Sequence, residues 1–160
     1  SFSAYTATNP PVTEAEMDSM LTLHLNYIES KIQPKPGIAG KRLFIGEYGW
    51  PELGLYANEP ATRTPEEINE RAKWVLKSGL KWGAPFILWW EMYNNELTKD
   101  GKNRGFWLLN DKGEKTSLYY IHRAVYNEAR EWLRMFVDTH RKMPSQDEFR
   151  KAALEFDVLR

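Results

Sequence analysis

Two short apolar runs constrain the fold of this chain more than any other feature. Residues 42–46 (RLFIG) and residues 85–90 (PFILWW) are bounded by Gly and Pro and are too short to form helices. Strands that are hydrophobic on both faces belong to parallel sheets covered by helices. Glu47 and Trp89 mark equivalent points of the two predicted strands. They are about 42 residues apart, which is enough for one strand, a long connection and a helix, that is, one βα unit. The chain is therefore predicted to have an α/β fold.

Amphipathic segments separate and follow the two runs. Apolar residues recur at helical spacing over residues 14–32, from Pro65 to near Gly83, and over residues 117–138. A short strand within residues 2–6 would precede the first helix. Capping-box patterns mark three helix starts, at Thr13–Glu16, Thr64–Glu67 and Ser145–Glu148. The last of these opens a helix with one apolar face, formed by Phe149, Ala152, Ala153 and Phe156.

Two architectures fit this order of elements. One is an open, doubly wound sheet, and the other is part of a (β/α)8 barrel. A complete barrel needs about 250 residues. This chain has 160 residues and supplies three βα units and a tail, so it would form only part of a barrel.

The composition excludes several classes of function. The chain has no Cys, which excludes disulfides, thiol catalysis and thiolate metal sites, and its net charge is zero, which argues against recruitment of nucleic acid or a membrane surface. Aromatic residues reach 14%, with seven Trp, against roughly two Trp usual for this length. Such an excess fits either a Trp-rich core or a cleft in which aromatic faces stack on sugar rings.

The predicted binding site lies where the strands end. Ligands of parallel α/β folds bind at the carboxyl ends of the strands. The first run leads into Glu47, which is flanked by Gly46 and Gly49 and followed by Tyr48 and Trp50. The second leads into a similar group of a carboxylate, aromatic residues and amides, formed by Glu91, Tyr93, Asn94 and Asn95. Alternation along a strand predicts that Leu43, Ile45 and Glu47 share one face, as do Ile87, Trp89 and Glu91. The alternative is that these residues have no binding role. The two carboxylates would then be solvated groups at the strand ends, and the Trp residues would pack in the core.

Four segments, in order and at this spacing, resemble the clan A glycoside hydrolases, a group of (β/α)8 retaining enzymes. Residues 42–51 (RLFIGEYGWP) resemble the seventh strand, which ends in Gly-Glu-Phe/Tyr-Gly. Residues 86–91 (FILWWE) resemble the eighth strand, whose Trp floors a sugar subsite. Residues 105–120 are similar to the closing hairpin and the start of the eighth helix. Residues 3–5 would match the end of the sixth strand.

The resemblance covers residues 1 to about 137 and implies a specific fold. We expect an α/β chain of the TIM-barrel type that contains only the sixth to eighth βα units, a partial barrel. Residues 1–138 would be the C-terminal portion of a glycosidase catalytic domain, and residues 139–160 a helical extension. Strands one to five would then precede Ser1.

The resemblance also implies a chemistry that this chain cannot complete. Glu47 matches the nucleophile of a retaining glycosidase, but nothing here corresponds to the acid/base Glu, which usually stands in Asn-Glu at the end of the fourth strand. Glu91 is the only nearby substitute, and it would lie beside Glu47 rather than across the sugar. The chain alone is therefore expected to be inactive, with the missing strands supplied by another polypeptide or by another copy.

The remaining expectations follow from the same resemblance. The substrate is a β-linked oligosaccharide or polysaccharide, and no metal or organic cofactor is required. A secreted or extracytoplasmic protein is favoured, although no signal peptide is visible, and a non-proline cis peptide is expected near Trp89–Glu91. An alternative is a non-catalytic carbohydrate-binding or structural fragment. The expected substrate-binding residues are Tyr5, Tyr48, Trp50, Trp89, Trp90, Glu91, Tyr93, Asn94 and Asn95.

Overall fold

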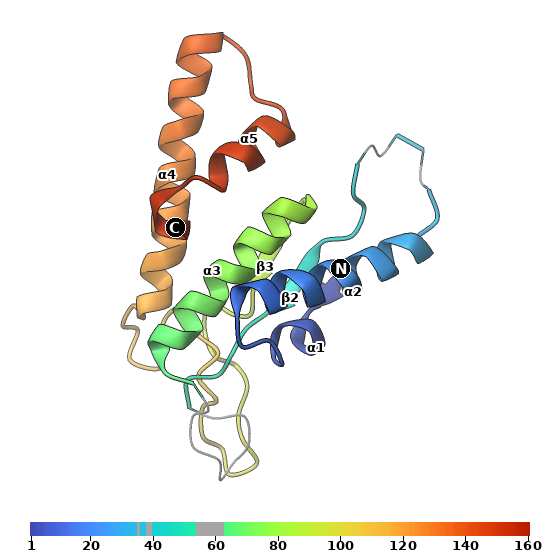
Figure 1. Ribbon diagram of the computed structural model, residues 1–160. Coiled ribbons are helices and arrows are strands. Elements are labelled where there is room, and N and C mark those ends of the chain that lie inside the picture. Colours follow the sequence, from blue (N-terminus) through green and yellow to red (C-terminus); the bar gives the residue numbers. More distant parts are fainter. Residues whose placement is uncertain (35, 38–39, 54–62) are drawn as a thin grey trace.

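Three parallel strands form one open sheet in the order β1–β2–β3, as a computed structural model of residues 1–34, 36–37, 40–53 and 63–160 shows (Figure 1). The strands are short: β1 spans Phe2–Ser3, β2 spans Ile45–Tyr48 and β3 spans Ile87–Trp89. Both pairings are parallel, with Phe2 opposite Ile45 and Ile45 opposite Ile87. The sequence therefore predicted the parallel sheet correctly.

Helices connect the strands and complete the chain. The first connection, from β1 to β2, runs through two helices, and the second, from β2 to β3, runs through one. The bounds are Tyr5–Thr8 (α1), Glu14–Lys31 (α2), Pro65–Trp82 (α3), Ser117–His140 (α4), Gln146–Ala153 (α5) and Asp157–Leu159 (the 3-10 helix η1).

The three predicted capping boxes are confirmed. At the start of α3, the backbone N–H of Glu67 donates to Thr64 Oγ1 at 3.2 Å, and Thr64 N–H donates to the Glu67 carboxylate at 2.8 Å. The same reciprocal pair forms at the starts of α2 and α5. The end of α3 is also set by a local signal, because Gly83 adopts the left-handed conformation (φ 91°) that favours glycine.

One face of the sheet packs against the helices. Ile45 and Ile87 point at α3, where a Cβ atom on Gly79 would lie 2.5 Å from Ile87 Cδ1 and 3.2 Å from Ile45 Cδ1. Leu43 and Ile45 are buried in the core. Helices α2 and α3 contribute half of the other side chains in the core cluster: Met17, Leu21, Leu25, Ile68, Ala72 and Val75.

The opposite face carries large apolar side chains that remain exposed. Phe86 is 62% exposed and Leu88 is 48% exposed, and the Phe44 and Phe86 rings pack edge to face at 5.8 Å. Leu43, Ile45, Ile87 and Trp89 do not lie on this exposed face. These four side chains pack with the helices, and the alternate residues face away from them.

A register irregularity in β2 breaks the alternation that the sequence predicted for this strand. The pairing shifts between Ile45 and Tyr48, so both of these residues are fully buried although they are three positions apart. Strict alternation would have put Glu47 on the face of Ile45. Instead, Glu47 is only half-buried and precedes Tyr48, which takes the place on the core face.

The partial TIM-barrel prediction for residues 1–138 is also wrong. The described residues form a small open sheet of three parallel strands combined with helices in a mixed α/β fold, and no part of a barrel wall beyond these strands is present among them. Short strands with apolar side chains on both faces occur in open sheets as well as in barrels. The apolar runs therefore predicted parallel pairing but did not determine whether the sheet closes.

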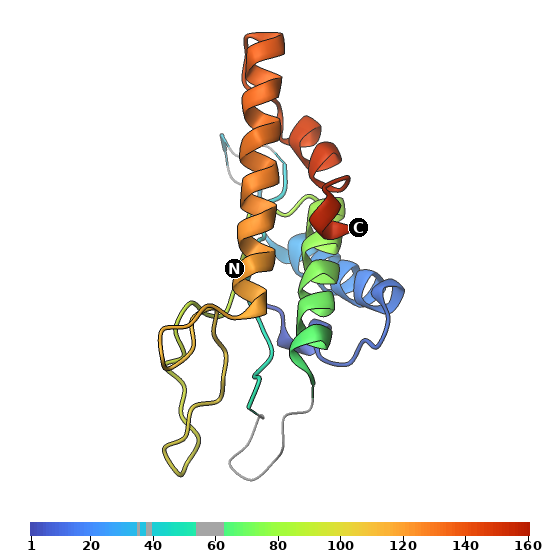
Figure 2. The same ribbon diagram turned by 90° about the vertical axis from the view of Figure 1, so that its left-hand side faces the viewer.

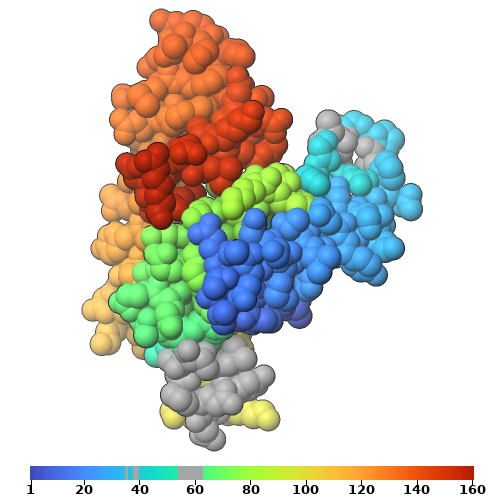
Figure 3. Space-filling model, viewed as in Figure 1, coloured from blue at the N-terminus to red at the C-terminus, as the bar shows by residue number. Residues whose placement is uncertain are grey.

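The C-terminal segment folds back on α4, which projects beyond the sheet (Figures 1 and 2). The Phe149 ring of α5 packs on Trp132 of α4 at 5.8 Å, and the Glu128 carboxylate accepts hydrogen bonds from the N–H groups of Asp157 and Val158. The space-filling view shows α5 and the C-terminus against α4 and next to α3 (Figure 3). No helix within the described ranges is long and apolar enough to cross a membrane.

Candidate functional site

The candidate site lies at the carboxyl edge of the sheet. Two backbone hydrogen bonds hold its segments together: Ala4 N–H donates to the Glu47 carbonyl at 2.9 Å, and Trp90 N–H donates to the Tyr48 carbonyl at 2.8 Å. Glu47 and Glu91 therefore follow adjacent parallel strands at the same end, as predicted. Tyr5, which starts α1 directly after β1, joins them from the other side of Glu47.

Three carboxylates lie within electrostatic reach of the Tyr5 hydroxyl. Burial raises the pKa of the Tyr5 hydroxyl, and the negative charges of Glu47, Glu96 and Glu91 raise this pKa further, whereas the Arg104 guanidinium lowers it. These effects require the charged groups to lie near the hydroxyl, because Coulomb interactions weaken with distance. The carboxyl edge of the sheet thus contains a phenol hydroxyl together with three carboxylates and one guanidinium group.

Glu47 and Glu91 are both half-buried. The Glu91 carboxylate accepts a hydrogen bond from Asn95 N–H at 3.1 Å, which ties it to the chain that follows. The peptide bond between Trp90 and Glu91 is cis, as the sequence predicted for this stretch. Glycine is required beside Glu47, since a Cβ atom on Gly49 would collide with the Trp90 carbonyl oxygen.

The structure places two of the predicted sugar-binding aromatics, Tyr48 and Trp50, in the core and packs a third, Trp89, against it. Tyr48 is fully buried and Trp50 is only 1% exposed, so neither ring offers a face to a ligand. Trp89 packs on Tyr48 at 5.3 Å and on Trp50 at 6.1 Å, and its other neighbour is His122 of α4 at 6.0 Å. Burial also raises the pKa of the Tyr48 hydroxyl.

The aromatics that remain available at the edge are Trp90 and Tyr93. Trp90 is half-buried, follows the last residue of β3 and donates its indole N–H to Glu96 at 2.9 Å. Tyr93 is 63% exposed. Among the predicted aromatic site residues, these two rings and that of Tyr5 are therefore the most available for contact with a sugar.

The side chains of the two predicted amide residues differ in how available they are to a ligand. Asn94 is committed to its own loop: its Oδ1 accepts from Gly105 N–H at 3.0 Å and Phe106 N–H at 3.2 Å, and its Nδ2 donates to the Glu96 carbonyl at 2.6 Å. Asn95 is exposed, and its side chain is the better placed to reach a ligand.

Two site residues were missed by the sequence analysis. Glu96 accepts a hydrogen bond from Trp90 Nε1 at 2.9 Å through one oxygen and pairs with Arg104 through the other. The Arg104 guanidinium also lies over the Phe106 ring, 5.0 Å from its centroid. Glu96 lies in the same polar segment as Glu91, Asn94 and Asn95, so the sequence could have indicated it. Arg104 is eight residues further along the chain and lies near Glu96 because an antiparallel bridge pairs Leu97 with Asn103.

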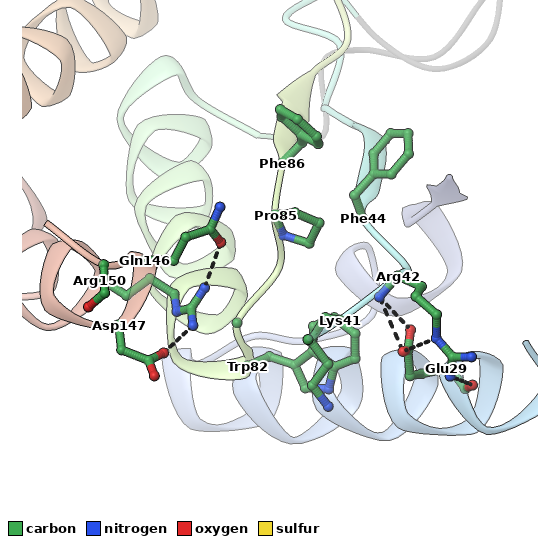
Figure 4. A pocket seen from close by; sticks show the side chains of 13 residues that line it. Glu29, Lys41, Arg42, Phe44, Trp82, Pro85, Phe86, Gln146, Asp147 and Arg150 are labelled. Carbon is green, nitrogen blue, oxygen red and sulfur yellow. Dashed lines mark hydrogen bonds and ion pairs between the residues drawn. The ribbon is translucent and has the colours of Figure 1, made fainter. Parts of the chain in front are cut away.

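A separate groove opens at the amino ends of the strands (Figure 4). It has a volume of about 1020 Å³, and its lining includes Phe44, Phe86, Trp82, Lys41 and Arg150. The Glu29–Arg42 and Arg150–Asp147 ion pairs flank it. The groove lies at the opposite end of the strands from Glu47, so it is not part of the candidate site.

Within the described residues, no group of three or more His, Cys, Asp or Glu side chains is placed to hold a metal ion. A half-buried carboxylate beside an aromatic ring can instead contact a sugar at its anomeric carbon while the ring stacks on its C–H face. Comparison of the chain with protein-family models, with curated proteins and with solved structures finds no match.

Proposed function

We propose that the carboxyl edge of the sheet binds a β-linked glycan and that Glu47 is the nucleophile of a retaining glycoside hydrolysis. The observation that carries this proposal is the placement of Glu47, Glu91 and Tyr5 at one edge of the sheet, with Trp90 directly before Glu91 in the chain. Retaining glycosidases need a carboxylate at the anomeric carbon and an aromatic platform for the ring. The resemblance of residues 42–51 and 86–91 to clan A strands supports the same assignment.

The proposed step is a substitution at the anomeric carbon. A Glu47 carboxylate oxygen forms a bond to this carbon while the bond to the leaving oxygen breaks, and the leaving oxygen takes the electron pair. The product is a glycosyl ester of Glu47, which water then hydrolyses. The Tyr5 hydroxyl lies within electrostatic reach of the Glu47 carboxylate, from the side of β1.

The leaving oxygen also needs a proton from a second carboxyl group, about 5–5.5 Å from the first in retaining enzymes. Glu91 follows the neighbouring strand and lies beside Glu47, and its carboxylate is already engaged by Asn95 N–H. In our proposal, the acid/base carboxylate is therefore supplied by a partner polypeptide. The isolated chain should bind glycans but hydrolyse unactivated substrates poorly.

A substrate with an activated leaving group tests Glu47 without the partner. Dinitrophenolate leaves without protonation, and a fluorine at C2 slows hydrolysis of the glycosyl ester, so the ester accumulates. We expect 2,4-dinitrophenyl 2-deoxy-2-fluoro-β-glucoside or β-mannoside to add one glycosyl group to the chain, with peptide mapping placing it on Glu47. Glu47→Gln should abolish the labelling.

Glu91→Gln is the matched control, because it removes the neighbouring carboxylate and leaves the nucleophile. Labelling that persists in Glu47→Gln, or that maps to Glu91, would refute the assignment. A second candidate function is glycan binding without cleavage, which is favoured by the exposed Tyr93 ring and the half-buried Trp90 ring. Binding of β-linked oligosaccharides with no labelling of Glu47 would identify this alternative.

A further inference from the structure

We infer that Glu96 is a positioning residue that holds the Trp90 indole as a fixed platform for the glycan. This inference rests on the proposed function for its ligand, but the contact itself can be tested without a ligand. It assigns a role to two residues outside the strand motifs, Glu96 and its partner Arg104.

The contact between Glu96 and Trp90 fixes the direction of the indole. Trp has a single polar hydrogen, on Nε1, and in Trp90 this N–H donates to Glu96 Oε1 at 2.9 Å. A half-buried indole can take more than one rotamer, and only one of them points Nε1 at this oxygen. A charged acceptor makes the hydrogen bond stronger than a neutral one would.

Glu96 is itself held at both its side chain and its backbone. Its second carboxylate oxygen pairs with the Arg104 guanidinium, which stacks over Phe106, and the Phe106 ring packs on Tyr5 at 6.3 Å. Its carbonyl accepts a hydrogen bond from Asn94 Nδ2 at 2.6 Å. The carboxylate therefore cannot follow the indole if the indole turns away.

This chain of contacts links the platform to the candidate nucleophile. Tyr5, at one end, lies within the electrostatic reach of Glu47, and Trp90, at the other, follows the strand next to that of Glu47. A glycan that stacks on Trp90 is thereby placed relative to Glu47 by a rigid network rather than by a mobile side chain. Freeing one side chain that must be ordered on binding should weaken affinity about three- to tenfold.

The test uses the indole N–H resonance of Trp90, assigned in a ¹H–¹⁵N spectrum as the peak that is lost in Trp90→Phe. In the ligand-free protein, Glu96→Ala should shift this peak and speed its exchange with water. Glu96→Gln retains an oxygen acceptor and should largely restore the peak. Glu70→Ala, which removes an exposed carboxylate of α3, is the control and should leave the peak unchanged.

Binding of β-linked glucose and mannose hexasaccharides, measured by titration calorimetry, tests the ligand role. Affinity should fall about three- to tenfold in Glu96→Ala and much less in Glu96→Gln, with similar melting temperatures for both variants. An unchanged Trp90 peak in Glu96→Ala would overturn the inference. So would a shifted peak combined with unchanged affinity.

Failure of the proposed function would look different. In that case the wild-type protein binds neither hexasaccharide, while the Trp90 peak still responds to Glu96→Ala. This outcome would support the contact between Glu96 and Trp90 and would reject a glycan as the molecule that uses it.

Discussion

Trp89 and Trp90 are consecutive residues whose indole rings have entirely different partners. Trp89 packs with Tyr48 and His122 on the helix side, whereas Trp90 donates its N–H to Glu96 at the carboxyl edge. The Trp pair therefore divides between the core and the candidate site, and its two members should respond differently to substitution.

We predict that Trp89→Ala lowers the free energy of unfolding by about 3 kcal/mol or more, because it removes a large ring from the core. Trp90→Ala should cost only about 1 kcal/mol, roughly the value of its hydrogen bond, while it weakens glycan binding. Urea unfolding followed by circular dichroism compares the two variants. Equal losses of stability would contradict the division between core and site.

Local signals explain why the helices could be predicted and the site only in part. Thr64 and Glu67 lie within one helical turn, so the start of α3 can be recognised from four consecutive residues. The face on which Glu47 lies depends instead on the register shift between β2 and β3, which involves residues far apart in the sequence. The pairing of Glu96 with Arg104 likewise forms only after the chain turns back on itself.

Gly49 is predicted to be intolerant of any side chain. A Cβ atom there would meet the Trp90 carbonyl oxygen, which is backbone and is held by the cross-strand hydrogen bond of the same residue. Gly49→Ala should cost about 1–3 kcal/mol of stability, as overpacking usually does.

Gly79→Ala provides the matched comparison for Gly49→Ala. Its Cβ would meet the side chains of Ile87 and Ile45, which can shift more easily than a backbone carbonyl, and alanine gains about 1 kcal/mol over glycine within a helix. The difference between the two unfolding midpoints is the measurement. A Gly79→Ala variant that is the less stable of the two would contradict this account.

His122 should make stability depend on pH. Burial lowers the pKa of its imidazole, and its Nδ1–H donates to the Leu118 carbonyl at 2.9 Å, which partly offsets that effect. The unfolded chain, with an ordinary His pKa of about 6.5, therefore binds a proton more readily than the folded chain does. Stability should fall as the pH drops below about 6.5, by at most about 1.4 kcal/mol per pH unit.

Substitution of the imidazole isolates this contribution. His122→Phe keeps a ring against Trp89 and removes the titrating group, so its stability should change less between pH 6.5 and pH 5 than that of the wild-type protein. Thermal melts at several pH values follow the difference. Parallel pH profiles for the two proteins would show that another group is responsible.

The exposed apolar face should make the isolated chain associate. Phe86 and Leu88 are large and open to water, and burying each would contribute roughly 1.5–3 kcal/mol. Light scattering should give a mass above the 18.8 kDa of one chain, rising with concentration. Phe86→Ser combined with Leu88→Ser should lower both this mass and the binding of a hydrophobic dye, whereas a wild-type protein that stays monomeric would contradict the prediction.

The capping boxes at Thr64 and Ser145 also bear on how this protein can change during evolution. Each box sets the first residue of its helix through contacts within four residues, without help from the chain that comes before. Insertions or deletions upstream of either box can therefore change the length of the preceding chain without rotating the helix behind it. The segments that lead into α3 and α5 are accordingly the places where sequence length can vary while the core contacts of those helices stay in register.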